Sequence, residues 1–184
     1  EAGKPVAVDG KKMKLSEIVI SLNKISGDNG FGRLDLVEDR LVGLKSRECY
    51  ECPAALLLIQ AHQSLEQLCL DAETLKQKAK LDVEWASTVY RGLWFSQNRN
   101  AIDAFNAYTQ KYVTGDVRII LCKGGLFVDG LRSDYSLYDY NLATYDEGDT
   151  FDHTAARGFI DLHGLQSKTW SRVQGPGSGL QPVE

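Results

Sequence analysis

The chain has 184 residues, of which 43% are hydrophobic and 25% are charged, and its formal net charge is −4. This length is enough for one domain with a sizeable core, and the composition is typical of globular proteins. A mildly acidic chain lacks the basic face of a general nucleic-acid binder, and no apolar run of about 18 residues predicts a membrane span. The four cysteines are too few for a disulfide framework and favour a reduced, cytoplasmic protein.

The first predicted elements are a short strand and turn over 5–10 and a helix that follows them. Ser16 is the candidate N-cap of this helix, and the glycines between 27 and 30 end it. Its apolar residues recur at helical spacing. They are Leu15, Ile18, Val19, Leu22 and Ile25.

Residues 32–53, GRLDLVEDRLVGLKSRECYECP, alternate in the manner of a hairpin. Glu38 stands at a turn or at a strand end, where a carboxylate stays solvated. Tyr50 lies between two cysteines, directly before a helix that Pro53 can begin because its missing N–H is not needed there.

The remaining pattern predicts further helices and one more hairpin. The helices are expected over 53–70, from an Asp71 cap to about Lys80, over 82–93, over 97–113 and over 154–166. The hairpin is expected over 116–132, with Gly124 and Gly125 supplying the positive dihedrals of its turn. Residues 133–149 are rich in tyrosine and irregular, and the glycine- and proline-rich tail is expected to be mobile. The predicted fold class is therefore α+β: a mixed or antiparallel sheet built from hairpins, packed with several helices, with a flexible C-terminal tail.

Residue spacing alone does not decide what chemistry residues 32–53 carry. The Cys49–Cys52 pair is typical of a thioredoxin-like redox site or of half a zinc site, but it has neither a βαβ context nor a second ligand pair, so an incidental pair is favoured. A strand-end carboxylate such as Glu38 is usually solvated surface, and a tyrosine such as Tyr50 usually covers a core. No metal site and no catalytic residue is predicted.

Several longer motifs, in order along the chain, carry a specific resemblance. They are GRLDLVEDRLVGLKSRECYE at 32–51, VYRGLWFS at 89–96, VTGDVRI at 113–119, SLYDYNLATYDEGD at 136–149 and AARGFIDLHGL at 155–165. Together they resemble argininosuccinate synthase, specifically its C-terminal synthetase and multimerisation domain, from about Pro5 to about Lys168.

The resemblance implies a domain over 1–170, a flexible tail over 171–184, and part of a ligase that condenses L-citrulline with L-aspartate in arginine biosynthesis or the urea cycle. That reaction consumes ATP, with Mg²⁺, and yields AMP and pyrophosphate. No SGGLDTS-type phosphate loop occurs here. The resemblance therefore implies that an N-terminal nucleotide-binding domain, absent from this segment, binds ATP, and that the segment alone is inactive.

Two residues match positions that contact citrulline in this family, Glu38 in the VE-[ND]-R pattern and Tyr50 in the YE-x-P pattern. The resemblance implies that they converge on one zwitterionic amino acid. It also implies a cytoplasmic homotetramer that contacts neither nucleic acid nor membrane. The alternative is a stand-alone module that only self-associates and has no catalytic activity.

Overall fold

The structure is a computed structural model that describes residues 1–143, 150–176 and 179. Its contacts divide the chain into two units, Glu1–Tyr138 and Asp139–Glu184, and each unit is described by itself. The described residues combine helices with three two-stranded antiparallel sheets. The predicted α+β class, built from hairpins and helices, is confirmed.

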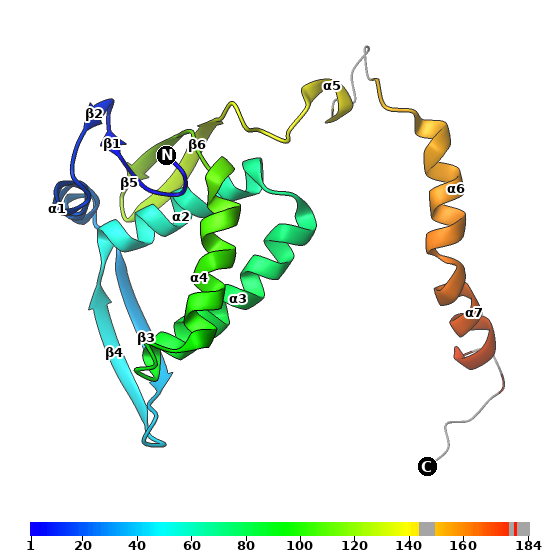
Figure 1. Cartoon of the computed structure of the whole chain (residues 1–184), viewed down its shortest axis with the longest axis horizontal. Helices are drawn as coiled ribbons and strands as arrows, with labels where there is room; N and C mark the ends of the chain where they lie inside the picture. Colours follow the sequence, from blue (N-terminus) through cyan, green and yellow to red (C-terminus); the bar gives the residue numbers. More distant parts are fainter. Residues whose placement is uncertain (144–149, 177–178, 180–184) are drawn as a thin grey trace. The chain divides into compact units, whose positions relative to one another are not determined.

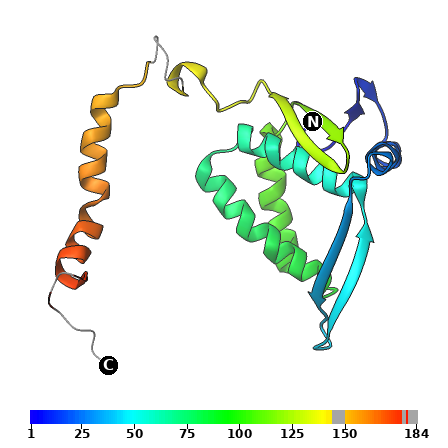
Figure 2. The same ribbon diagram turned by 180° about the vertical axis from the view of Figure 1, so that it is seen from behind.

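The first unit holds six strands and most of the helices (Figure 1). Its elements are β1 (Ala7–Val8), β2 (Lys11–Lys12), α1 (Leu15–Asp28), β3 (Arg33–Asp39), β4 (Lys45–Glu51), α2 (Pro53–Cys69), α3 (Ala72–Tyr90), α4 (Gln97–Thr109), the 3₁₀ turn η1 (Gln110–Tyr112), β5 (Asp116–Cys122) and β6 (Gly125–Arg132). Helix α2 runs through the middle of this unit, between the β5–β6 hairpin and the α3–α4 pair (Figures 1 and 2).

The core of the first unit consists of two clusters along α2. At the N-terminal end of α2, Ala54 and Leu57 pack against Ile18 and Leu22 of α1. At its C-terminal end, Leu65 and its neighbours surround the fully buried Val113. Because both clusters rest on α2, this helix is the frame to which the hairpins attach.

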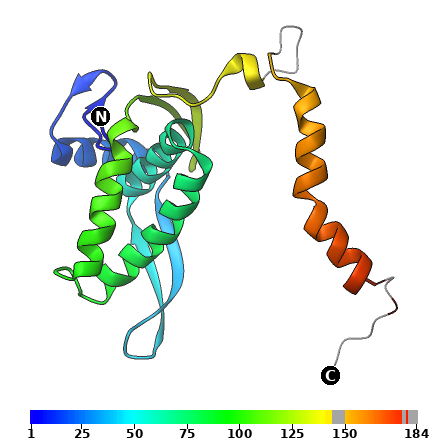
Figure 3. The same ribbon diagram turned by 45° about the vertical axis from the view of Figure 1, so that its right-hand side comes forward.

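The β3–β4 hairpin is fixed to the start of α2 by a close backbone approach. Gly32, which precedes β3, has φ +111°, and a Cβ there would lie 2.3 Å from the Cα of Pro53. Cys52 N–H donates to the carbonyl of Gly32 at 2.9 Å, directly before Pro53 begins the helix. Only glycine combines this dihedral with such a close contact. The hairpin therefore leaves α2 in a defined direction, alongside the α3–α4 pair (Figure 3).

Two of the helices predicted after α2, from the Asp71 cap to about Lys80 and over 82–93, form the single helix α3. Asp71 caps α3 as expected, because its carboxylate accepts from the N–H groups of Glu73 and Thr74. The expected break between Lys80 and Asp82 is wrong, because α3 continues to Tyr90. Asp82 lies inside α3 and pairs with Lys78 one turn earlier, at 2.6 Å, and such a pair supports a helix interior.

Two smaller expectations also need correction. Helix α1 begins at Leu15, with Lys14 rather than Ser16 as its N-cap. The Glu17 carboxylate accepts from Lys14 N–H at 2.9 Å, which fixes the earlier start. In the second hairpin the positive dihedrals belong to Lys123 and Gly124, because Cys122 pairs with Gly125 and leaves two residues in the turn.

The second unit contains α5 (Tyr140–Ala143), α6 (His153–His163) and α7 (Leu165–Gln174). Asp152 caps α6 by accepting from Thr154 N–H. The expected end at Gln166 is wrong, because Gly164 itself has helical dihedrals and a second helix follows it. Residues 171–174, expected in the tail, thus belong to α7. Most of the remaining tail lies outside the described residues, so its expected flexibility stays a prediction.

Candidate functional site

Glu38 and Tyr50 lie together on the β3–β4 hairpin. The ladder pairs Glu38 with Ser46 and Leu34 with Tyr50, so the two residues belong to opposite strands and to the same face. The Tyr50 hydroxyl donates to both Glu38 carboxylate oxygens, at 3.2 Å to Oε1 and 3.3 Å to Oε2. The structure therefore brings the two predicted site residues together.

This contact is longer than a strong hydrogen bond from a hydroxyl to a carboxylate, which measures about 2.5–2.7 Å. A carboxylate has two acceptor oxygens with about four lone-pair sites, so Glu38 can accept from a further donor beside Tyr50. Tyr50 is 42% exposed, so a ligand can reach the pair from solvent.

Alternation along the two strands divides the hairpin into two faces. The inner face carries Leu34, Leu36, Glu38, Ser46, Glu48 and Tyr50, and the outer face carries Asp35, Val37, Asp39, Lys45, Arg47 and Cys49. The side chains of Glu38, Ser46 and Glu48 are half-buried, whereas every outer-face residue is exposed. The inner face is thus the more sheltered side of the hairpin.

Arg40 lies just beyond β3 and is held across the hairpin by two inner-face side chains. Its Nε donates to Ser46 Oγ at 2.9 Å, and its Nη2 donates to Glu48 Oε1 at 2.6 Å. The hydrogen bond to Glu48, followed by the charges of Glu48 and Glu38, raises the pKa of Arg40 above its ordinary value. A guanidinium held at two points has a fixed orientation, so the inner face has an ordered arrangement of charges.

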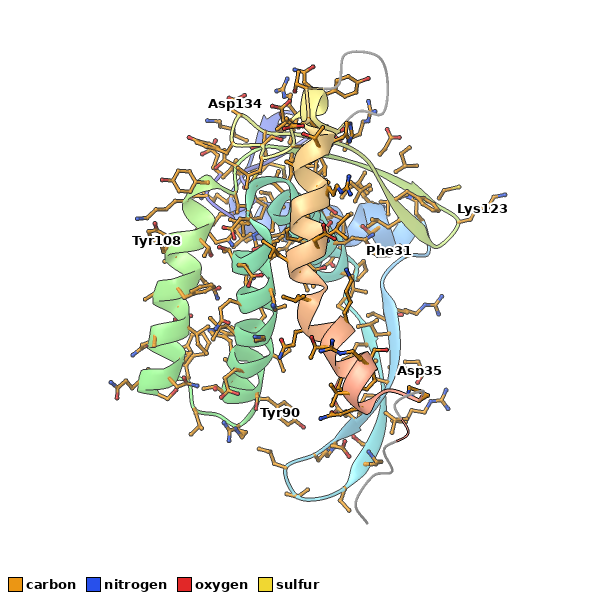
Figure 4. The ribbon with its side chains drawn as sticks, turned by 90° about the vertical axis from the view of Figure 1, so that its right-hand side faces the viewer. Phe31, Asp35, Tyr90, Tyr108, Lys123 and Asp134 are labelled. Carbon is orange, nitrogen blue, oxygen red and sulfur yellow. The ribbon has the colours of Figure 1, made fainter. Side chains whose placement is uncertain are left out.

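The C-terminal end of α3 adds a further aromatic side chain to this region. The Tyr90 hydroxyl donates to the carbonyl oxygen of Asp39 at 3.3 Å. Figure 4 labels Tyr90 at this end of α3 and Asp35 on the hairpin. The Tyr90 contact ties the far end of β3 to the helices.

The surroundings of Tyr50 favour its neutral hydroxyl. Desolvation is the largest cause that raises the pKa of Tyr50 above its ordinary value, followed by the hydrogen bond to Glu38 and the charges of Glu38 and Glu48, while Arg40 opposes them. Near neutral pH the phenol therefore keeps its proton and acts as a donor.

The cysteines do not share one environment. Cys49 is on the exposed outer face, Cys52 precedes α2, and both are free thiols. In the part of the chain that the structure describes, no three His, Cys, Asp or Glu side chains gather as metal ligands would.

A second polar cluster was not predicted from the sequence. Glu66 of α2 is 4% exposed and accepts from Gln110 Nε2 at 2.6 Å, while Lys78 Nζ lies 3.3 Å away. His62 is half-buried, with its Nε2 2.7 Å from Gln110 Oε1. This cluster joins α2, α3 and η1.

Sequence reasoning also missed Arg40, Ser46, Glu48 and Tyr90. The signal for Ser46 and Glu48 was available, because strict alternation within one strand places both of them on the face of Tyr50. No local pattern indicates Tyr90, whose place depends on how α3 packs.

The fold and this hairpin define an α+β domain that presents a polar, tyrosine-containing surface on a hairpin anchored to a central helix. The sequence matches the family described as Arginosuccinate synthase C-terminal domain over residues 1–170. The chain belongs to this family, which links it to the argininosuccinate synthase ligase and to arginine biosynthesis. Among the described residues, no helix is long and apolar enough to cross a membrane.

Proposed function

We propose that this domain forms part of the citrulline site of an argininosuccinate synthase, a ligase that joins L-citrulline to L-aspartate with conversion of ATP to AMP and pyrophosphate. The observation that carries the proposal is the 3.2 Å contact between Tyr50 and Glu38 on a face that solvent reaches. Family membership supports the reaction class.

Glu38 suits the ammonium end of the substrate. Citrulline carries an α-ammonium and an α-carboxylate at one end and a neutral ureido group at the other. The Glu38 carboxylate accepts a charge-assisted hydrogen bond from the ammonium, which is about twice as strong as a neutral one. The same carboxylate disfavours an anionic head group, so it selects for an amino acid presented by its amino end.

Tyr50 has a positioning role beside Glu38. Its neutral hydroxyl donates to the carboxylate and can accept from the ligand, so it orients the charged pair without adding charge. Neither residue acts as an acid or a base. Their effect on the rate comes from holding the ureido oxygen near the α-phosphate of ATP, since orientation supplies much of a bimolecular reaction's acceleration.

The nucleotide and aspartate are assigned to a separate nucleotide-binding domain that completes the pocket. The described residues offer neither a phosphate loop nor a metal-ligand cluster, so no step of ATP or Mg²⁺ chemistry is assigned to them. This domain alone is expected to be inactive.

The test is steady-state kinetics of the assembled enzyme, made of this chain and a nucleotide-binding domain of the family. Glu38→Ala should raise the KM for citrulline about 10- to 100-fold, the equivalent of one hydrogen bond to a charged group, and leave the KM for ATP within about twofold. Tyr50→Phe should act in the same direction and less strongly. An equal increase in both KM values would contradict the proposal.

A second candidate function is self-association through the second unit. Phe159, Ile160, Leu162, Leu165 and Trp170 are all more than half exposed there. Exposed apolar side chains on adjoining helices mark a contact surface, and a homotetramer is the expected assembly. Sedimentation of the chain tests this, because Phe159→Ser with Trp170→Ser should shift it to a smaller species, whereas an unchanged mass would exclude this surface.

A further inference from the structure

The inner face of the hairpin carries one more carboxylate than it has cations. Glu38 and Glu48 both interact electrostatically with Arg40, the one cation that acts on Tyr50 in this neighbourhood of the described chain. The hydrogen bond goes to Glu48, 2.6 Å from Arg40 Nη2, and Ser46 holds the other side of the guanidinium. Glu38 is left with the Tyr50 hydroxyl as its partner.

This partition matters because Arg40 and a substrate ammonium would compete for the same carboxylate. Arginine carries a permanent charge and a fork that matches a carboxylate with two bonds, so it is a strong competitor. Ser46, which holds the Arg40 Nε at 2.9 Å, is the cross-strand partner of Glu38, so the guanidinium lies next to that carboxylate. Without Glu48, Glu38 is the inner-face carboxylate left for Arg40 to pair with.

We propose that Glu48 is a positioning residue for the citrulline site: by holding Arg40 against Ser46, it keeps the guanidinium away from Glu38 and leaves that carboxylate available to an α-ammonium group. This inference rests on the proposed function for its ligand. Glu48 itself does not touch the substrate. Its effect passes through Arg40, and the net charge of the three groups, −1, suits a cationic head group.

The test is a double substitution in the assembled enzyme. Glu48→Gln removes the charge that holds Arg40, so Arg40 moves to Glu38 and the KM for citrulline should rise about tenfold, as for one charged hydrogen bond. Arg40→Gln combined with Glu48→Gln removes the competitor too, and should return that KM to within about threefold of the wild type. The KM for ATP should not change in either variant.

The outer face supplies a matched control. Arg47 Nε donates to Asp35 Oδ1 at 2.8 Å, which is an ion pair of the same kind on the opposite side of the hairpin. Asp35→Asn frees Arg47 in the way that Glu48→Gln frees Arg40, and should leave the KM for citrulline unchanged. A double variant of Arg40 and Glu48 no better than Glu48→Gln alone would overturn the proposal, since it would mean that Arg40 contacts the substrate or that the hairpin is merely destabilised.

A second readout separates this proposal from the proposed function. In the 184-residue chain, ¹³C-tyrosine NMR follows the titration of Tyr50, assigned with Tyr50→Phe. Removing the negative charge of Glu48 lowers the pKa of Tyr50 by itself, so the fall in Glu48→Gln is compared with the fall that the same change causes in an Arg40→Gln background. If Arg40 moves onto Glu38, the fall should be larger when Arg40 is present. If Glu38→Ala leaves the KM for citrulline unchanged, the proposed function fails, and the Tyr50 titration still decides whether Glu48 holds Arg40. Equal falls in the pKa of Tyr50 with and without Arg40 would overturn the proposal.

Discussion

Lys78→Met should destabilise the first unit strongly, because it removes a charge from a buried pair. Lys78 is 8% exposed and Glu66 is 4% exposed, with 3.3 Å between Lys78 Nζ and Glu66 Oε1. Removing one partner of a buried ion pair costs about 3–5 kcal/mol. Methionine keeps the packing of the lysine stem, and Gln110 still donates to Glu66 at 2.6 Å. The expected loss in the free energy of unfolding is therefore at the low end of this range, about 3 kcal/mol. In a domain of this size that is about 6–12 °C in Tm.

Urea unfolding followed by circular dichroism measures this loss of stability. A double-mutant cycle with Glu66→Gln then gives the interaction energy between Lys78 and Glu66. The double variant should recover part of the loss, because it leaves no uncompensated buried charge, and the coupling should exceed about 1 kcal/mol. Lys76→Met is the control, since Lys76 pairs with Glu73 on the exposed side of the same helix at 3.7 Å and should cost less than about 0.5 kcal/mol. A Lys78→Met cost as small as that of Lys76→Met would refute the reasoning.

Two further predictions concern the scaffold of the site. Gly32→Ala forces a Cβ to 2.3 Å from Pro53 and a side chain into φ +111°, so it should cost more than about 2 kcal/mol in urea unfolding. Gly43→Ala, with φ +82° and open space around it, should cost only about 1–2 kcal/mol, and equal costs would show that the close approach is unimportant. Acid unfolding should report on Asp71, whose pKa is held below 3.8, first by the hydrogen bond from the Thr74 hydroxyl. The stabilisation from the ionised Asp71 is present above pH 3.8 and is lost as the pH falls through the lowered pKa. In Asp71→Ala the free energy of unfolding should therefore fall less steeply with decreasing pH in this range. The same pH dependence in Asp71→Ala and in the wild type would exclude this contribution.

The local elements of this chain follow from local patterns, and the exceptions have identifiable physical causes. Alternation predicted the β3–β4 hairpin, and the Asp71 cap and Pro53 placed the starts of α3 and α2. Two of the errors occur where a side chain reaches about one turn along a helix. Asp82 was expected to begin a new helix, but it lies inside α3 and pairs with Lys78, and Glu17 moves the start of α1 to Leu15.

Two residues of the candidate site could be predicted from the sequence, but by family resemblance and not by local patterns. Glu38 and Tyr50 were identified through a family pattern, and their contact is a product of hairpin register, which spacing alone does not fix. The partition of Arg40 between two carboxylates depends on side-chain geometry across the turn. The approach of Tyr90 depends on tertiary packing of α3. Neither follows from periodicity.

The most direct test of the central claim changes the ligand and the protein together. The assembled enzyme is assayed for binding of L-citrulline and of 5-ureidopentanoate, the same molecule without its α-amino group. If Glu38 binds the ammonium, the wild type should prefer citrulline by about 10- to 100-fold, and Glu38→Gln should lose most of that preference. A preference that survives intact in Glu38→Gln would contradict the account, because the ammonium would then be recognised by other residues.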